Sequence, residues 1–529
     1  MFDYLIRNAM LIDGTGAPAV RGGLAIQDGK IAAVGQLSAA SAAHEIDAQG
    51  MYLTPGFLDI HRHADDAIFR LGFGRAELAQ GLTTIVNGNC GLSLAPVPMA
   101  RRPEIYGYLT PVTGLPAESL PTQTMQSYLD AVGAVALPLN TGMLVGGGTV
   151  RAAAAGFSPE PLDSAALREV HRLLEESLSG GALGVSLGLG YAPECFYTTQ
   201  QLIDALAPLY QSGVAITVHM RQEGAGVVEA LEEMMAVARA LRTPVHISHL
   251  KSIGKAYWGR YMPRMLEILT RAREEGLDVS CDLYPYTAGS TQLIHVLPPE
   301  SQDGGLAALT KNLREPAFRA RMRERMLTGT DFENLSLLVG WENIDVSTVR
   351  KKENRRFVGR SIAEIAQAEG VDPFDFTFDL LASEDCTVTM IDRITSDADI
   401  CAALRVPFSS VISDATYPTS GLLHPRVYGN CTHLIEQYVR RQSVLTLEEA
   451  VRKLTSLPAD VLGLRTKGRL AAGMDADLCL FDPKALHETA TWQAPTQLSE
   501  GMRYVFVGGV PAICKGTFTD AANGRVLRR

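Results

Sequence analysis

Six side chains that can bind metal or carry protons stand at the ends of apolar, strand-like runs of the sequence. They are His61 and His63 after GFLDI, Cys90 after TTIVNGN, His219 after VAITV, His249 after VHIS, and Asp414 after SSVIS. Imidazole, thiolate and carboxylate groups are the ligands that zinc prefers. The six residues therefore predict a zinc site, provided that the elements carrying them meet at one place.

Each of these residues alone has an ordinary structural explanation. A histidine in an apolar strand is more often a hydrogen-bonded core residue than a ligand, and a lone cysteine is more often a small buried side chain. His246, three residues before His249, is expected to be such a core residue. The metal interpretation depends on coincidence, because packing needs alone rarely place five ligands and a carboxylate at strand ends.

The elements that must position these residues form a regular alternation. Eight apolar, β-rich runs are separated by longer stretches, several with helical periodicity; the runs are GFLDIHRH, TTIVNGNC, GMLVGGGT, ALGVSLGL, VAITVHMR, VHISHLK, DVSCDLYPY and SSVISDA. Apolar strands that alternate with amphipathic helices indicate a parallel sheet covered by helices. Eight of them predict an α/β fold closed into a (β/α)8 TIM-like barrel, in which the carboxyl ends of all strands converge on one site.

The two ends of the chain have a different texture, with short strands and tight turns. LAIQDGKIAAVG predicts a hairpin that turns at Asp28-Gly29, and YVFVGGVPAICKG predicts another that turns at Gly508-Gly509. Neither end supplies enough strands for a stable sheet. We therefore expect one small β-sandwich domain built from residues 1–54 and 466–529, with the barrel occupying residues 55–465.

Two long segments interrupt the barrel pattern, at about 97–137 and about 287–352. The second contains a charged helical stretch, EPAFRARMRERML. Both follow strands, so both are expected on the face where barrel active sites form. A role as a lid or in substrate specificity and a role as packing on the barrel both remain open.

Composition limits the possible partners and the compartment. The formal net charge is -10, with 48 basic and 58 acidic residues, which gives no support to binding of nucleic acid or an anionic membrane. The eight cysteines are scattered singly, as expected for reduced thiols in a cytoplasmic protein. No apolar run approaches the length of a membrane helix. Oligomeric state is not readable from the sequence.

The motifs resemble those of the amidohydrolase superfamily, and within it the N-acyl-D-amino-acid deacylase (D-aminoacylase) family. The matching segments extend almost from end to end and include PGFLDIHRHADD, GNCGLSLAP, VHMRQEG, ISHLK, DLYPYTAGST, HPRVYGN and GRLAAGMDADLCLFDP. HxH alone would be a weak signal, whereas the GNCG segment discriminates. Other superfamily members commonly use a carboxylated lysine or a glutamate after a middle strand, and here the fourth run offers no lysine.

The resemblance implies a role for each matching residue. Cys90, His219 and His249 would hold a tightly bound Zn²⁺, and His61 and His63 would form a second, weaker metal position. Asp414 would be the catalytic carboxylate, acting as general base and then general acid around a metal-activated water. The residues at positions that bind the carboxylate of the amino-acid product are Lys251, Tyr284, Ser290 and Arg426. Lys251 and Arg426 are cations that a substrate carboxylate would explain, although pairing with nearby acids would explain them equally.

The chain departs from the family pattern at two places. Many relatives carry a histidine in the third run, where this sequence has Gly147. Glu194 and Cys195, after the fourth run, replace a more apolar stretch. The first difference leaves open which substrate is used.

The implied function is hydrolysis of the amide bond of a small N-acyl amino acid, with D-configuration implied only by the resemblance. A cyclic-amide hydrolase of the hydantoinase or dihydroorotase type would share the same metal site. A deaminase would leave Lys251 and Arg426 unexplained. An inactive barrel that serves as a binding or scaffold protein is the alternative of another class, and the presence of every ligand and of Asp414 speaks against it.

Overall fold

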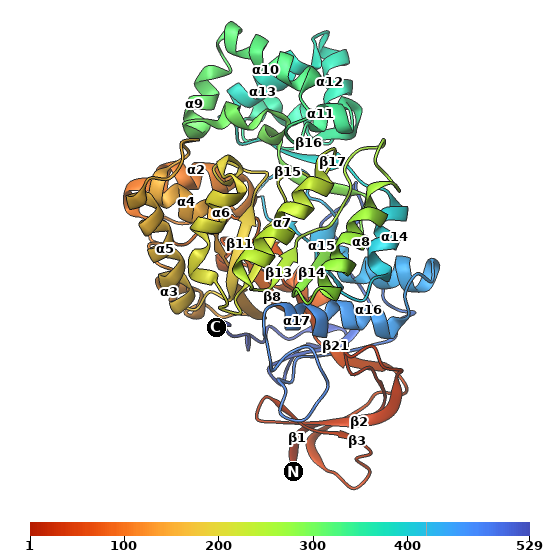
Figure 1. Cartoon of the computed structure of the whole chain (residues 1–529). Helices are drawn as coiled ribbons and strands as arrows, with labels where there is room; N and C mark the ends of the chain where they lie inside the picture. The colour runs from red at the N-terminus through yellow and green to blue at the C-terminus, as the bar shows by residue number, and fades with distance from the viewer. Residues whose placement is uncertain (419) are drawn as a thin grey trace.

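The structure is a computed structural model that describes residues 1–418 and 420–529. The middle part of the molecule contains parallel β-strands, and these strands coincide with the eight predicted runs (Figure 1). In chain order the strands are β6 (Phe57–Asp59), β7 (Arg62–His63), β8 (Leu82–Asn87), β9 (Asn140–Met143), β10 (Val145–Gly146), β11 (Gly184–Gly188), β12 (Ala215–His219), β13 (Val245–Ile247), β14 (Val279–Leu283), β18 (Ser409–Val411) and β19 (Ala415–Thr416).

The strands pair in the order in which they occur along the sequence, and the last segment pairs with the first. Strands β6, β8 and β9 form one parallel set, and β10 to β14 followed by β18 form another. The Leu144 amide between β9 and β10 donates to the carbonyl of Asn87, so both belong to the third segment. The circuit ends where β19 pairs in parallel with β7 and the Asp414 amide donates to the His61 carbonyl. This is the pairing expected of a TIM-barrel-like fold.

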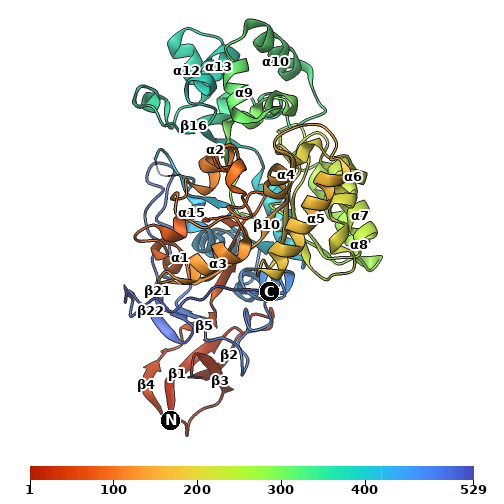
Figure 2. The ribbon, with the colours of Figure 1, turned by 90° about the vertical axis from the view of Figure 1, so that its left-hand side faces the viewer.

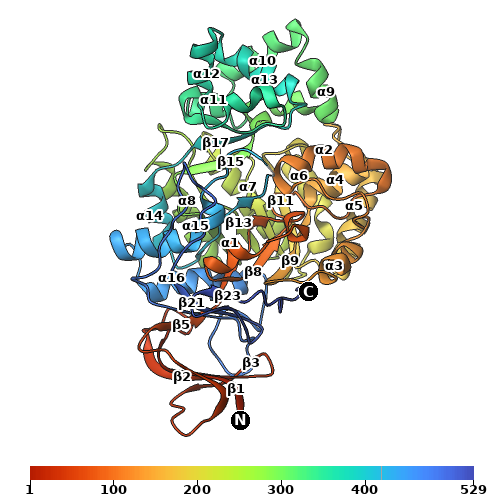
Figure 3. The ribbon, with the colours of Figure 1, turned by 180° about the vertical axis from the view of Figure 1, so that it is seen from behind.

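Helices cover the outside of these strands (Figures 1 and 3). The predicted amphipathic stretches fold as α6 (Thr199–Ala205), α7 (Val227–Leu241) and α8 (Tyr261–Glu274), each after the expected strand. The other covering helices are α1 (Arg75–Ala79), α4 (Gly147–Ala155), α5 (Ser164–Ser179), α14 (Asp397–Arg405), α15 (Arg426–His433), α16 (Leu447–Leu454) and α17 (Ser456–Val461). Buried Leu, Val and Met residues on their inner faces pack on the strands.

The two interrupting segments have structure of their own. The first contains α2 (Arg102–Thr113) and α3 (Met125–Gly133). The second starts at β15 (Ala288–Gln292) and continues past the expected end at 352 to β17 (Thr389–Arg393), which pairs with β15 and with β16 (Ile344–Thr348). Between these strands lie α9 (Gly305–Asn312), α10 (Pro316–Thr328), α11 (Leu335–Leu338), α12 (Ile362–Glu369) and α13 (Pro373–Ser383). We call residues 288–393 the inserted segment; its helices form a separate lobe at one end of the molecule (Figures 1 and 2).

Strands from both ends of the chain share one sheet at the opposite end of the molecule (Figure 2). Strand β5 (Tyr52–Pro55) pairs antiparallel with β20 (Leu478–Phe481) and joins the two groups. The others are β1 (Phe2–Leu11), β2 (Val20–Gln27), β3 (Lys30–Gly35), β4 (Ala42–Asp47), β21 (Met502–Val507), β22 (Val510–Cys514) and β23 (Thr517–Phe518). Both termini thus contribute strands to one sheet.

Both predicted hairpin turns have the expected backbone. Asp28 and Gly29 have φ of 53° and 74°, and Gly508 and Gly509 have φ of 53° and 80°, as a type I′ turn requires. Positive φ at two successive positions is accessible mainly to glycine, asparagine and aspartate, which accounts for the sequences found there. Among the described helices, none combines the length and apolar character needed to cross a membrane.

Candidate active site

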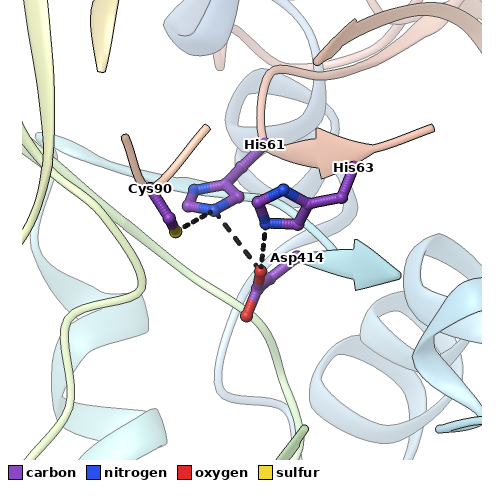
Figure 4. A group of neighbouring side chains, drawn as sticks. All are labelled: His61, His63, Cys90 and Asp414. Carbon is purple, nitrogen blue, oxygen red and sulfur yellow. Dashed lines mark hydrogen bonds and ion pairs between the residues drawn. The ribbon is translucent and has the colours of Figure 1, made fainter. Parts of the chain in front are cut away.

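The structure brings the six predicted chemical residues together at the carboxyl ends of the barrel strands. Figure 4 shows that the imidazoles of His61 and His63 point toward the carboxylate of Asp414, with Cys90 beside His61. The ligand atoms form two groups, and within each group all atoms lie within 4.8 Å of one another. One group comes from His61, His63, Cys90 and Asp414, and the other comes from Cys90, His219 and His249. Cys90 belongs to both groups, so its thiol lies between two possible metal positions.

Distances between the ligand atoms are close to the spacing of a coordination shell, and most are slightly shorter. Cys90 Sγ lies 3.2 Å from His61 Nε2 and 3.5 Å from His249 Nε2, and His219 Nδ1 lies 3.0 Å from His249 Nε2. Asp414 Oδ1 lies 3.2 Å from His63 Nε2. Ligands at about 2.0–2.3 Å from a tetrahedral zinc ion stand roughly 3.3–3.8 Å apart. The two groups therefore have donor types that zinc prefers, at separations slightly shorter than those around a bound ion.

The backbone at three of these residues is unusual. Cys90, His249 and Asp414 have φ of 54°, 39° and 49°, a region that non-glycine residues rarely adopt. Such conformations persist where the surrounding structure enforces them, and they cluster at functional sites. They turn the side chains inward immediately after the strands end.

The two glycines of the GNCG motif are required by the space around Cys90. A Cβ on Gly88 would lie 2.3 Å from the Leu144 carbonyl oxygen, and a Cβ on Gly91 would lie 2.1 Å from Glu194 Oε2. Asn89 between them donates from Nδ2 to the Ile60 carbonyl at 3.0 Å, which ties this loop to the first barrel strand. The motif thus fixes the position of the thiol.

The surroundings favour charged forms of Cys90 and Asp414. Burial opposes ionisation of the Cys90 thiol, but His61 and hydrogen bonds with His219 and His249 hold its pKa well below the usual value. Burial also opposes ionisation of Asp414, but Arg426 and hydrogen bonds from His61 and His63 keep its pKa well below that of an ordinary aspartate. A thiolate is the form of cysteine that binds metal, and a carboxylate is the form that accepts a proton.

Glu223 supports this site, and the sequence analysis did not identify it. Its Oε1 lies 2.9 Å from His249 Nδ1, and its Oε2 accepts from Lys251 Nζ at 2.7 Å. Burial opposes its ionisation, but Lys251, His219 and His249 lower its pKa below the usual value. A carboxylate on the second nitrogen of a ligating histidine orients that ring. The signal was present in VHMRQEG, where Glu223 follows His219 by four residues.

Asp282 is a second supporting carboxylate that the sequence analysis missed. It accepts from the His249 backbone amide and lies 2.9 Å from His246 Nε2, whose Nδ1 lies 2.7 Å from Ser280 Oγ. His246 is therefore a buried, hydrogen-bonded strand residue outside both ligand groups, as predicted. A lone aspartate within the apolar run DVSCDLYPY was the available signal.

Of the four residues assigned to carboxylate binding, Lys251, Tyr284 and Ser290 line one cavity, and Arg426 is buried next to Tyr284. Tyr284 is flanked by Arg426, whose Cζ lies 4.5 Å from the ring centroid, and by Lys251, whose Nζ lies 5.7 Å from it. Arg426 Nη2 donates to the Ser290 carbonyl at 3.4 Å and pairs with Asp414 Oδ2 at 3.0 Å. Its Nε and Nη1 are buried without a partner among the described residues. Lys251, in contrast, already pairs with Glu223.

The two departures from the family pattern occupy the same space. A Cβ on Gly147 would lie 2.3 Å from Glu194 Oε1, so the Glu194 side chain fills the volume that a side chain at position 147 would need. Glu194 is 1% exposed and its Oε2 accepts from the Gly188 amide at 2.7 Å. Burial raises its pKa to about 8. Cys195 contributes its carbonyl oxygen, which accepts from Arg221 at 2.8 Å.

A cavity opens from the ligand groups toward the inserted segment. Its wall includes His219, His249 and Asp414 on the barrel side, with Lys251, Tyr284 and Ser290 beside them. The far wall comes largely from residues between Thr291 and Ile394. A ligand in this cavity would touch both the metal-binding groups and the inserted segment.

Comparison with known proteins gives consistent matches over the whole chain. The amidohydrolase family model matches residues 44–391 and 402–513. D-aminoacylase of Alcaligenes xylosoxydans xylosoxydans is 33% identical over 528 residues, covering 100% of this chain and 98% of that protein. N-acyl-D-glutamate deacylase of the same organism is 33% identical over 529 residues, covering 100% of this chain and 96% of that protein.

A solved structure matches equally well. N-acyl-D-glutamate deacylase from Bordetella bronchiseptica, in complex with zinc and a phosphonate inhibitor that mimics the tetrahedral intermediate, superposes with a TM-score of 0.84 at 30% identity, and the match covers 100% of both chains. The family model, the full-length relatives and the solved structure all indicate the same family. This chain therefore belongs to the amidohydrolase family.

Proposed function

We propose that this chain is a zinc-dependent N-acyl-D-amino-acid deacylase, which hydrolyses the amide bond to a carboxylate and a free amino acid. The observation that carries the proposal is the position of Asp414. Its Oδ1 lies 3.2 Å from His63 Nε2 and 3.4 Å from His61 Nε2, while its Oδ2 lies 3.0 Å from Arg426 Nη2. One carboxyl group thus joins the metal-binding groups to a buried cation.

This spacing suits an N-acylated α-amino acid. In such a substrate, one nitrogen and one carbon separate the amide carbonyl from the carboxylate. A carbonyl at the ligand groups would therefore place the carboxylate within reach of Arg426. Two unpartnered N–H groups of Arg426, with Tyr284 and Ser290 beside it, are available to a carboxylate.

The metal would be held by the residues that the resemblance assigns. Cys90, His219 and His249 would bind a zinc ion tightly, and His61 and His63 would hold a second, weaker position. The Nδ1 atoms of His61 and His63 lack hydrogen-bond partners among the described residues. Zinc, when bound, polarises an amide carbonyl and makes a coordinated water more acidic. The zinc in the related Bordetella structure supports this choice of metal.

Asp414 would move the proton. Its lowered pKa keeps it ionised, so it can accept a proton from the attacking water. It would then donate that proton to the nitrogen of the leaving amino acid, which cannot depart as an amide anion. Arg426 holds the other oxygen of the same carboxylate and fixes its orientation.

The experiment that tests the function combines metal analysis with a substrate panel. Purified protein should contain zinc and should hydrolyse N-acetyl-D-amino acids with kcat/KM at least about 100-fold above their L-enantiomers, a ratio that differential transition-state binding can provide. Removal of zinc with a chelator should abolish turnover, and adding zinc back should restore it. Hydantoins and dihydropyrimidines serve as the comparison, because faster opening of these rings would replace the proposal with a cyclic-amide hydrolase.

The domain limits and location are proposed on the same basis. We place the β-domain at residues 1–54 and 466–529 and infer that its sheet folds over as a sandwich around one apolar cluster, which includes Ile6, Leu24, Leu53, Leu478 and Phe506. All eight cysteines have free thiols, which suits a cytoplasmic enzyme. We infer that the binding partner is a small N-acylated molecule. The net charge of -10 gives no support to binding of nucleic acid or anionic membranes.

A further inference from the structure

The far wall of the cavity contains an apolar surface. Six side chains, mostly from the inserted segment and its borders, form this surface: Ile253, Leu297, Pro299, Phe332, Leu335 and Ile394. Five of them are almost fully buried and Pro299 is partly buried. Such a surface would accept an alkyl chain that extends from the α-carbon of a substrate.

Two carboxyl groups lie in the same wall without a cation of their own. Asp392, on β17, is 3% exposed, and its Oδ1 has no hydrogen-bond partner among the described residues. Glu333, between α10 and α11, accepts from the Gly224 amide at 3.2 Å through Oε2, while its buried Oε1 has no partner in the same described set. Within the described residues, neither carboxyl group forms an ion pair closer than 4.0 Å.

Gln302 adds a side-chain amide to this wall. Gln302 is 2% exposed, and its Oε1 has no partner among the residues that the structure describes. Asp392 and Glu333 thus each add a buried oxygen without a partner to the residues that line this cavity, and Gln302 adds an amide with both an acceptor and a donor. Buried polar atoms of this kind are costly unless a ligand or water completes their hydrogen bonds.

The cations near the cavity are already engaged. Arg221 makes two hydrogen bonds to Glu233, at 3.0 and 2.9 Å, and a third to the Cys195 carbonyl. Lys251 pairs with Glu223. Burial lowers the pKa of His295 to about 3, so this ring is neutral. Arg426 pairs with Asp414 at the proposed carboxylate position, so each charged group named here already has an acidic partner.

We propose that this wall is the subsite for the substrate side chain and that it selects a basic side chain, as in N-acyl-D-lysine or N-acyl-D-arginine. The inference rests on the proposed deacylase function. The alkyl stem of such a side chain would pack on the apolar surface, and its cationic tip would donate to Asp392 and Glu333. Lysine and arginine side chains commonly bury their stems in this manner while the charged head finds polar partners.

An acidic side chain is disfavoured by the same arrangement. N-acyl-D-glutamate would bring a second negative charge beside two carboxyl groups that lack cations. Burial raises the pKa of Glu333 to about 7 and that of Asp392 to about 6, although Lys251 and Arg426 oppose the shift at Asp392. A cationic ligand would favour the ionised form of both groups, whereas an anionic ligand would have to bind beside their protonated forms. Selectivity therefore differs from that named for the D-glutamate deacylase relative.

The test compares three substrates of similar length: N-acetyl-D-lysine, N-acetyl-D-norleucine and N-acetyl-D-glutamate. The zinc-loaded enzyme should show kcat/KM for the lysine substrate roughly 10- to 100-fold above that for norleucine, the range that a hydrogen bond to a charged group supports. The glutamate substrate should be the slowest. Asp392→Asn and Glu333→Gln should each reduce the lysine-to-norleucine ratio about tenfold while changing norleucine turnover little.

Asp345→Asn is the matched control. Asp345 lies on β16, next to β17, and pairs with Arg393 at 2.8 Å, so this variant removes the same charge from the same sheet away from the cavity wall. Its lysine-to-norleucine ratio should equal that of the wild type. Melting temperature and zinc content identify any variant that folds poorly, and Glu333→Gln carries the test if Asp392→Asn does so.

Several outcomes would overturn the subsite. One is equal or faster hydrolysis of the norleucine or glutamate substrate; another is an unchanged ratio in both variants. These failures differ from failure of the proposed function, since in that case none of the three N-acetyl-D-amino acids would be hydrolysed. Fast norleucine hydrolysis with slow lysine hydrolysis would remove the subsite and leave the deacylase.

Discussion

The barrel rim and the inserted segment face each other across one cavity, and they carry their charged groups differently. On the rim, Asp414, Glu223 and Lys251 each pair with a defined partner. On the inserted segment, Asp392 and Glu333 each have a buried oxygen without a hydrogen-bond partner and, unlike Glu223, form no ion pair among the described residues. Groups that must hold one protonation state through a reaction benefit from such fixed pairs. Groups that wait for a ligand lack partners until it binds. The difference suggests that the rim performs the chemistry and the inserted segment selects the substrate.

The largest effect is expected from Asp414→Asn. Asparagine cannot accept and return the proton, so kcat should fall by about 10²- to 10⁴-fold, the usual contribution of a general acid–base group. The lysine-to-norleucine ratio of the residual activity should not change, because Asp414 lies on the rim. Steady-state kinetics and zinc analysis on the same preparation check both statements. Retention of near-normal kcat would remove Asp414 from the mechanism, and loss of zinc would give it a different role.

Arg426→Lys should have a smaller effect and tests the border between the two regions. Arg426 contacts Asp414 on the rim and the Ser290 carbonyl on the inserted segment. An ammonium group cannot reproduce the planar fork of donors, so KM should rise about tenfold or more, with a smaller decrease in kcat. An N-acyl amine that lacks the carboxylate is the control substrate, and its kcat/KM should fall only by the smaller factor seen in kcat. Equal losses for both substrates would argue against carboxylate binding by this residue.

The smallest effect is expected from substitutions at Gly147 and Glu194, which should lower stability and leave the lysine-to-norleucine ratio unchanged. Gly147→Ala places a methyl group 2.3 Å from Glu194 Oε1, and overpacking of this kind costs about 1–3 kcal/mol. Combined with Glu194→Ala, the two losses of unfolding free energy should be less than additive, by about 1 kcal/mol. Chemical denaturation of both single variants and the double variant measures this coupling.

Gly107→Ala provides the control for that cycle. Gly107 lies in α2, and a Cβ there would meet nothing within 4 Å. Alanine at this position should therefore leave stability unchanged or slightly raised. Strict additivity between positions 147 and 194 would mean that Glu194 moves aside freely, and the two departures from the family pattern would then be unrelated.

Much of the barrel and of its ligand set could be predicted from the sequence. The eight apolar runs coincide with the eight parallel segments, because burial on both faces demands unbroken apolar strands. His61, Cys90, His219 and Asp414 could be identified because strand ends in a barrel converge whatever their distance in sequence. Glu223 and Asp282 were missed, since a single acid near a strand end does not reveal which histidine it contacts.

The inserted segment could be predicted from the sequence only in part. Its charged helix was predicted as α10, but its continuation from 352 to β17 was not, because β17 returns to pair with β15 across about a hundred residues. Asp392 lies in the β-rich run VTMIDRI and Glu333 in the polar stretch GTDFENL, and neither pattern by itself indicates a binding site. Whether these two side chains line one cavity depends on the position of the inserted segment relative to the barrel rim.

The sequence by itself determined the kinds of groups available and the strands that present them, since apolar periodicity and the positions of metal-binding side chains are local properties of the chain. Only the tertiary structure decided which of these groups are paired and which are left free. Pairing depends on distances of a few ångströms between residues far apart in sequence: Asp414 with Arg426, His249 with Glu223, and Gly147 against Glu194. Such distances are fixed only when the whole fold closes.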